Sequence, residues 1–358
     1  NNMGVALHDK GDIDSAIGSY QQAIKINPDS AEAYNNIGLS MRSKGDLEAA
    51  IDSFKQAIKI NPDYAEAYNN IGLFMRSKGD LEAAIESYNK AIRIRFDYAE
   101  AHNNMGTALQ HKGDLDVAVE SYKHAIRIQF DYAEAYYNIG TALQDKGSLE
   151  AAIVNYKEAI KIKPNYSDAY NNMGNTQFAM GDLESAINSF KKALKIKPDS
   201  AETYSNMGNA LKNKGDLEAA IISFEKALEL RPDFAEAYYN MGISMREKGD
   251  IEAALKSYEQ ALKIKPDYAQ AYNNMGAALQ DKGDVEAAID SLNKALSIKP
   301  DYAEAHNNMG AALLDKGKFD SAIDSYKQAI KIKPDYADAT YNLSFPHLLR
   351  GSLEKGFN

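Results

Sequence analysis

The chain of 358 residues contains no cysteine and no apolar stretch long enough to span a bilayer. The absence of cysteine excludes disulfides and thiolate metal sites, and it fits a reducing compartment. Basic residues are not in excess, since 41 Lys and Arg face 51 Asp and Glu and leave a net charge of −10. Nucleic acid and anionic membranes both require a basic face. We therefore expect neither as a partner, and we expect a cytoplasmic location.

No linker, low-complexity tract or signal peptide is visible in the sequence. The chain opens at position 5 of its repeat without an initiator Met, so we expect the natural N-terminus to be missing and the chain to be a fragment. No change of composition divides it. The sequence therefore predicts one elongated domain over residues 1–358.

One residue pattern returns every 34 residues along the whole chain. With Ala31 as position 1, nine full repeats cover residues 31–336, and partial repeats cover residues 1–30 and 337–358. Self-similarity at such a period is the signature of a repeat architecture, in which length measures a stack and not a number of globular domains.

Each repeat has the signals of two helices, illustrated by residues 63–98. Asp63 is placed to cap the first helix, with Glu66 returning the bond as in a capping box. The first helix then runs to about Lys78. Gly79 stands where a left-handed residue is needed, and Asp80 is placed to cap the second helix.

The last partial repeat departs from this pattern. Pro346 lies inside its expected helix, where an interior proline costs roughly 3 kcal/mol, so we expect a kink or an early end there. No second helix follows to cover the apolar side chains Phe345, Leu348 and Leu349. End-to-end self-association is therefore expected as one possible mode of partner binding.

The landmarks of the repeat are large, small and turn residues at fixed places. In the first full repeat they are Tyr34, Ile37, Gly38, Met41, Ala50, Phe54, Ala57 and Pro62. This pattern resembles the tetratricopeptide repeat (TPR), with Tyr or His in place of its first Trp, and with Phe96 and Phe130 in place of the loop proline. The resemblance implies an all-α fold, a right-handed TPR α-solenoid superhelix of helix-turn-helix repeats, whose first helices line a concave face. The two Phe are expected to form a local apolar patch.

Asparagine occupies position 6 of every repeat, from Asn2 to Asn342. In the full repeats this ladder consists of Asn36, Asn70, Asn104, Asn138, Asn172, Asn206, Asn240, Asn274 and Asn308. Asn is a middling helix former, but its amide can donate to and accept from a peptide group. The array is similar to the superhelix of O-linked N-acetylglucosamine transferases, where such a ladder grips the backbone of an extended substrate. The sequence therefore predicts a non-catalytic scaffold that holds an extended protein or peptide.

Three alternatives remain open at this stage. The ladder asparagines could instead join neighbouring repeats by bonding a backbone group of the next repeat, which would be purely structural. The chain could be the substrate-recruiting arm of a larger protein O-glycosyltransferase, because its last residues resemble the closing repeat of bacterial TPR proteins that continue into a transferase domain. It could also be a self-assembling scaffold.

Specificity is expected in the variable positions of the first helix, where positions 2, 5, 6, 9, 12 and 13 are expected to face the groove. Position 5 is Asn in most repeats and is Tyr137 and Tyr239 in two of them, while position 12 varies between Arg, Gln, Lys and Phe178. We take Tyr137, Phe178 and Tyr239 as candidate aromatic anchors. The candidate polar contacts at position 12 are Arg42, Arg76 and Arg246.

No feature of the sequence indicates catalysis. The six His are scattered, no Cys accompanies them, and the acidic residues recur at helix caps. We predict no catalytic residue, no metal site and no cofactor. Clamps for a C-terminal carboxylate in this family need Lys at positions 2 and 5 and Arg at position 6, where this chain has Glu, Asn and Asn, so an internal extended segment is the expected guest.

Overall fold

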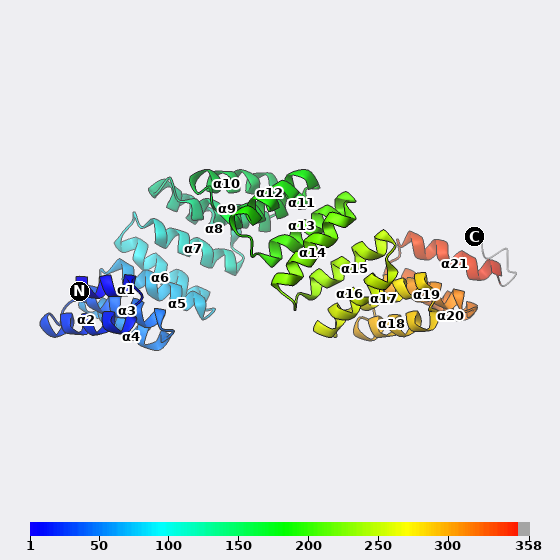
Figure 1. The fold of residues 1–358 in the computed structure, drawn as a ribbon. Coiled ribbons are helices and arrows are strands. Elements are labelled where there is room, and N and C mark those ends of the chain that lie inside the picture. Colours follow the sequence, from blue (N-terminus) through cyan, green and yellow to red (C-terminus); the bar gives the residue numbers. More distant parts are fainter. Residues whose placement is uncertain (350–358) are drawn as a thin grey trace. The chain divides into compact units, whose positions relative to one another are not determined.

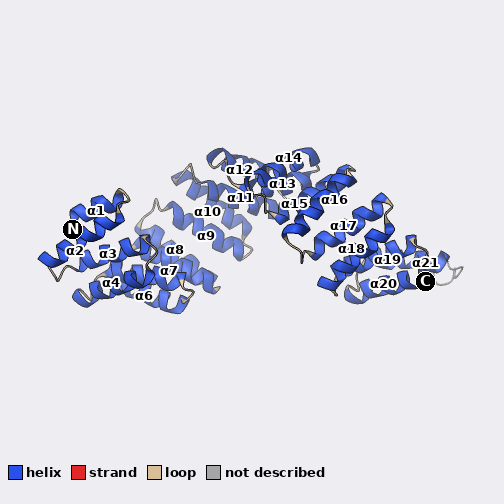
Figure 2. Ribbon diagram, turned by 60° about the horizontal axis from the view of Figure 1, so that its bottom comes forward, coloured by secondary structure: helices blue, strands red, loops and turns tan. Residues whose placement is uncertain are grey.

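The computed structural model describes residues 1–349 (Figures 1 and 2), and all regular structure in them is α-helical. It divides into two compact units, Asn1–Met180 and Gly181–Asn358, and each is described by itself. The first unit contains α1 (Asn2–Asp9), α2 (Ile13–Ile26), α3 (Ala31–Ser43), α4 (Leu47–Ile60), α5 (Ala65–Ser77), α6 (Leu81–Ile94), α7 (Ala99–Lys112), α8 (Leu115–Ile128), α9 (Ala133–Asp145), α10 (Leu149–Ile162) and α11 (Ser167–Ala179). The second unit contains α12 (Leu183–Ile196), α13 (Ala201–Lys214), α14 (Leu217–Leu230), α15 (Ala235–Lys248), α16 (Ile251–Ile264), α17 (Ala269–Lys282), α18 (Val285–Ile298), α19 (Ala303–Asp315), α20 (Phe319–Ile332) and α21 (Ala337–Leu349).

The turn between the two helices of a repeat has the predicted chemistry. Gly79 has a φ of 83°, in the left-handed region, and the same position is left-handed from Gly11 to Gly317. Asp80 Oδ1 accepts a hydrogen bond from the backbone N–H of Ala83 at 3.0 Å, which caps the second helix. The prediction for this turn is confirmed within the described residues, and Gly351 lies outside them.

The start of the first helix differs from the prediction. Helix α5 begins at Ala65 with Tyr64 as its N-cap residue, and no side chain caps it. Asp63 instead lies in the preceding turn, where its N–H donates to Asn61 Oδ1 at 3.1 Å. The capping box assigned to Asp63 and Glu66 is therefore wrong, because the turn after the second helix is one residue longer than the sequence pattern suggested.

Helices within a repeat approach closely at a glycine. A Cβ atom added to Gly72 would lie 2.5 Å from Cε1 of Tyr88, which is fully buried. Ala84 and Ala91 on the same second helix are also fully buried. Since such a contact is shorter than van der Waals packing permits, position 8 requires glycine wherever an aromatic ring occupies position 24.

The helix around Pro346 continues further than predicted. Helix α21 runs through Pro346 to Leu349, and the proline side chain is buried. Of the two outcomes predicted at this proline, the early end is therefore wrong, and the kink stays a prediction. A proline here removes only one backbone bond near the last turn, and burial of its ring offsets part of that loss.

Helices pack in consecutive pairs, and each pair packs on the next within its unit. The predicted fold class, an all-α TPR solenoid, is confirmed. The single domain over residues 1–358 and the right-handed superhelix remain predictions.

Candidate functional site

The first helices of successive repeats form a continuous surface within each unit. In the first unit α5 contacts α3 and α7, and in the second unit α17 contacts α15 and α19. Second helices of successive repeats make no comparable contact in residues 1–349. A stack whose first helices lie closer together curves toward them. We call this surface the first-helix face, and the binding residues predicted from the sequence all lie on first helices.

The ladder asparagines bond the repeat that precedes their own. Asn70 Nδ2 donates to Asn35 Oδ1 at 2.9 Å, and Asn104 Nδ2 donates to Asn69 Oδ1 at 3.0 Å. The same bond joins Asn138 to Asn103, Asn308 to Asn273, Asn342 to Asn307 and Asn36 to Asn1. The ladder asparagines therefore join neighbouring repeats. Each bonds a side chain at position 5, and not the backbone group that the structural alternative predicts.

These bonds engage one end of each ladder amide. The Oδ1 atoms of Asn70, Asn104 and Asn138 accept no hydrogen bond from any residue in 1–349. An asparagine side chain has two N–H donors and one carbonyl acceptor. The bond to the preceding repeat therefore fixes the orientation of the amide and leaves its carbonyl oxygen without an intramolecular partner.

Four rungs of the ladder differ from this pattern. Asn172 and Asn274 donate to the tyrosine hydroxyls of Tyr137 and Tyr239, at 2.9 and 3.0 Å, and each accepts from the Asn before it. Asn206 also has a partner. The side chain of Asn240 makes no hydrogen bond within residues 1–349, because the residue at position 5 of the preceding repeat is a serine with a shorter side chain.

Position 5 is not available on the surface. Asn69 and Asn103 are each 1% exposed, although position 5 was expected to face the groove. Their Nδ2 atoms donate to Glu100 Oε1 and Glu134 Oε1, both at 3.3 Å, while their oxygens accept from the ladder. The expectation is wrong for these asparagines, because the interface between repeats consumes both ends of their amides.

The two candidate anchors at position 5, Tyr137 and Tyr239, pack against other tyrosines of their own repeats. Tyr137 lies with its ring centroid 5.9 Å from Tyr156 and 5.1 Å from Tyr166. Tyr239 lies 6.2 Å from Tyr258 and 4.9 Å from Tyr268. Both are half-buried, as is Phe178 on α11. Their role as aromatic anchors stays a prediction.

The candidate arginines fall into two groups. Arg42 is exposed and Arg76 is half-buried, and neither forms an ion pair within residues 1–349. Arg246 Nε donates to Asp281 Oδ2 of the next repeat at 2.6 Å. Arg246 therefore bonds across a repeat junction, whereas Arg42 and Arg76 form no such ion pair within residues 1–349.

The residue at position 12 decides whether the tyrosine beneath it has a hydrogen-bond acceptor. Gln110 and Gln144 accept from the hydroxyls of Tyr122 and Tyr156, at 3.0 and 2.9 Å. Where position 12 is arginine, the hydroxyls of Tyr88 and Tyr258 are buried without any partner. Arginine has no acceptor atom, so it cannot replace glutamine in this bond. Burial raises the pKa of Tyr88 to about 12.

A cavity of about 290 Å³ lies beside Arg246 and Tyr258. Its lining residues are Ile243, Arg246, Glu247, Tyr258, Asn274 and Asp281. The sequence did not indicate Tyr258, because aromatic residues at position 24 have the spacing of core residues. Asp281 stands at position 13, which was expected to face the groove, but it was not singled out as a contact. The available signal was the combination of Arg at position 12 with Tyr at position 24, which occurs in only two full repeats, 65–98 and 235–268.

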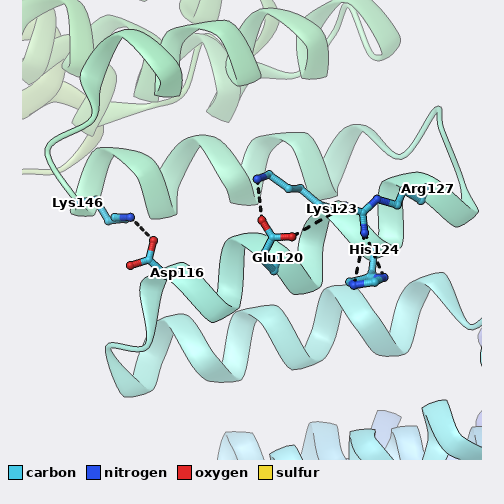
Figure 3. A network of polar contacts seen from close by, with 6 residues as sticks. All are labelled: Asp116, Glu120, Lys123, His124, Arg127 and Lys146. Carbon is cyan, nitrogen blue, oxygen red and sulfur yellow. Dashed lines mark hydrogen bonds and ion pairs between the residues drawn. The ribbon is translucent and has the colours of Figure 1, made fainter.

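The outer surface carries ion pairs between repeats. In Figure 3, Lys146 pairs with Asp116 of the preceding repeat, and Lys123 Nζ lies 2.8 Å from Glu120 Oε1 on the same helix, α8. A lysine before the turn makes the equivalent pair in Lys44–Asp14, Lys214–Glu184, Lys248–Glu218, Lys282–Glu252 and Lys316–Glu286. Exposed pairs of this kind contribute about 0–1 kcal/mol each, so they support the stack without dominating its stability.

Exposed apolar residues occur at two of the places that the sequence indicated. Phe96 and Phe130, in the loops where other repeats have proline, are 82% and 81% exposed. At the last helix Phe345 and Leu349 are 37% and 63% exposed. End-to-end association through this helix remains a prediction. In residues 1–349 no helix combines the length and apolar character that crossing a membrane requires.

Comparison with known families agrees with this architecture. A model of the TPR repeat matches residues 4–45, 38–76, 75–113, 111–147, 140–181, 174–215, 208–245 and 244–283, and a model of the tetratricopeptide repeat matches residues 267–335. The chain belongs to the tetratricopeptide repeat family. No curated protein sequence matches it.

Comparison with solved structures finds the following likenesses. The Cut9–Hcn1 structure of the APC/C hetero-tetramer is 15% identical, with 96% of this chain and 74% of that chain covered and a TM-score of 0.56. The Pseudomonas aeruginosa pilF structure is 21% identical, with 60% of this chain and 96% of that chain covered and a TM-score of 0.53. YrrB, described as a TPR protein with an unusual peptide-binding site, is 25% identical, with 52% and 96% covered and a TM-score of 0.46. The first two likenesses concern the fold alone.

Proposed function

We propose that this TPR scaffold holds a protein or peptide segment in extended conformation along its first-helix face, with the asparagine ladder bonding the guest backbone. The chain itself is assigned no catalytic step. The observation that carries the proposal is the half-engaged state of the ladder. The side chains of Asn70, Asn104 and Asn138 each donate one N–H to the preceding repeat. Their carbonyl oxygens accept no hydrogen bond within residues 1–349.

Orientation of the ladder amides reduces the free energy needed to bind. A neutral hydrogen bond contributes about 0.5–1.5 kcal/mol net, whereas ordering one residue of a flexible guest costs about 1–2 kcal/mol. An amide already fixed by its neighbour loses little further freedom when a guest N–H donates to it. The ladder then supplies sequence-independent contacts, and the variable side chains on the same face supply the specificity.

The test distinguishes guest binding from a purely structural role of the ladder. It removes the same three hydrogen bonds between repeats, from the donor side in one variant and from the acceptor side in the other. One variant replaces Asn70, Asn104 and Asn138 with Ala, and its matched control replaces Asn35, Asn69 and Asn103 with Ala. Both variants lose the bonds between repeats, but only the first loses the unengaged carbonyl oxygens. Binding is measured against a library of short unstructured peptides, and the melting temperature of each variant is recorded.

We expect both variants to melt at a lower temperature than the parent chain. At equal folded fraction we expect the ladder variant to lose more peptide binding than the control, because the control keeps the ladder carbonyl oxygens and loses only the bond that orients them. Equal binding by the two variants at equal folded fraction would show that the ladder has a structural role alone. A parent chain that binds no peptide would reject the proposal directly.

A further inference from the structure

In the repeat at residues 235–268, polar side-chain groups that form hydrogen bonds in several other repeats have no partner. The side chain of Asn240 has no hydrogen-bond partner in residues 1–349. Two turns further along α15, Arg246 replaces the glutamine that elsewhere accepts from a tyrosine hydroxyl. The hydroxyl of Tyr258, a residue with 0% exposure, is consequently left without a partner. All three residues belong to one repeat, so this part of the first-helix face differs from its neighbours.

The unpaired hydroxyl of Tyr258 is unusual for a buried polar group. Leaving a buried donor unsatisfied is unfavourable, and most such groups in folded proteins have a partner. The structure shows how the same chain avoids the problem elsewhere, since Gln144 accepts from Tyr156 at 2.9 Å. A glutamine at position 246 would do the same for Tyr258. Arginine leaves the hydroxyl available to an acceptor from outside the chain.

The cavity beside Tyr258 has the size of a side-chain pocket. Its volume of about 290 Å³ lies at the lower end of the range for ligand sites, roughly the space of ten water molecules. Arg246 Nε is bound to Asp281, and its remaining N–H groups have no acceptor within residues 1–349. The Arg246 side chain is 35% exposed, and it has to shift for a ligand to reach the buried hydroxyl below it.

Donors and acceptors in this cavity are mixed. Arg246 and Tyr258 offer N–H and O–H donors, while Glu247 and Asp281 offer carboxylate acceptors. We propose that this cavity binds the side-chain carboxamide of a glutamine or asparagine in the extended guest. The carboxamide oxygen accepts from Arg246 and Tyr258, and its NH₂ donates to Asp281 or Glu247. This inference rests on the proposed function, since it names the residue that one place on the guest presents.

Other side chains match the cavity less well. A carboxylate meets Glu247 and Asp281, which repel it, and an ammonium meets Arg246 and cannot accept from Tyr258. A hydroxyl offers both roles on one oxygen, whereas a carboxamide places donor and acceptor on separate atoms. Binding of a carboxamide satisfies groups of both kinds, so exchanging it for an apolar residue leaves them unpaired again.

The experiment measures side-chain preference on immobilised short peptides in which one residue at a time is Gln, Asn, Glu, Lys, Ser or Ala. The full chain is compared with Arg246→Gln, in which the new glutamine accepts from Tyr258 and closes the pocket. The control is Lys123→Gln, which removes a positive charge from α8, a second helix, away from the first-helix face. Melting temperatures are recorded for all three proteins.

The parent chain and Lys123→Gln are expected to bind Gln or Asn at one place in the peptide about ten-fold more tightly than Ala, the factor equivalent to 1.4 kcal/mol. Arg246→Gln is expected to lose that preference while melting at the same or a higher temperature. A preference that survives Arg246→Gln, or a preference for Glu, Lys, Ser or Ala, overturns the carboxamide assignment and leaves the proposed function standing. If the parent chain binds no peptide, the proposed function fails and this inference fails with it.

Discussion

The repeats at 99–132 and 133–166 in the first unit and the repeat at 235–268 in the second differ by one residue in their polar network. In the first two, Gln110 and Gln144 accept from the tyrosine below, so the polar groups are satisfied within the chain. In the third, Arg246 bonds only Asp281 and leaves the Tyr258 hydroxyl buried without a partner. The side chain at position 12 thus either satisfies the buried tyrosine hydroxyl, which stabilises the stack, or leaves that hydroxyl available to a ligand.

The ladder shows the same division of labour. Asn104 gives an N–H to Asn69 and contributes to the contact between repeats, whereas Asn240 contributes no bond to the stack. Replacing residues of the first kind should lower stability, and replacing residues of the second kind should change binding alone.

The largest effect is expected at alkaline pH, and it affects both kinds of repeat. Burial raises the pKa of Tyr88 and of Tyr122 to about 12, compared with about 10 in an unfolded chain. Below pH 10 both states are protonated and stability is complete. As the pH rises from about 10 to 12 the unfolded chain ionises first, so stability is lost. Urea unfolding midpoints between pH 8 and 12 should stay constant and then fall, and a flat profile would contradict this account.

Gln144→Arg converts a satisfied repeat into the arginine type. It removes the acceptor of Tyr156 and also the Oε1 that accepts from Thr176 at 2.8 Å. Leaving a buried hydroxyl unpaired costs about 1–3 kcal/mol, so we expect a loss of about 2 kcal/mol in the free energy of unfolding. Urea denaturation measures it. An unchanged midpoint would mean that the glutamine bond contributes nothing to the stack.

Removing the hydroxyls themselves should give opposite results in the two regions. Tyr156→Phe deletes a bonded hydroxyl and should cost about 1 kcal/mol. Tyr258→Phe deletes an unbonded buried hydroxyl and should leave stability unchanged or slightly raised. The same denaturation measurement compares the two proteins, and equal losses would show that the Tyr258 hydroxyl has a partner in solution.

Much of the fold could be predicted because its signals are local. The left-handed Gly79 and the cap at Asp80 depend on a few neighbouring residues, and both were predicted correctly. The errors at Asp63 and Pro346 concern helix ends, where one residue of turn or the burial of a ring decides the outcome.

The candidate site was less predictable because its bonds join residues about one repeat apart. Placing the ladder on the first helix follows from the period, but the partner of each amide depends on how neighbouring repeats pack. The burial of Asn69 and the bond between Arg246 and Asp281 both arise at such junctions. Aromatic residues at position 24 look like core from their spacing, so the unpaired hydroxyl of Tyr258 had no local signal.

Replacing Asn240 with Ala is the sharpest test of guest binding by the ladder, because the Asn240 side chain has no hydrogen bond to lose within residues 1–349. Affinity for a peptide selected by the parent chain and the melting temperature should be measured on Asn240→Ala and on Asn104→Ala, which loses its bond to Asn69. We expect Asn240→Ala to weaken binding several-fold at an unchanged melting temperature, while Asn104→Ala lowers both. Unchanged affinity in Asn240→Ala would contradict the claim that the ladder bonds a guest.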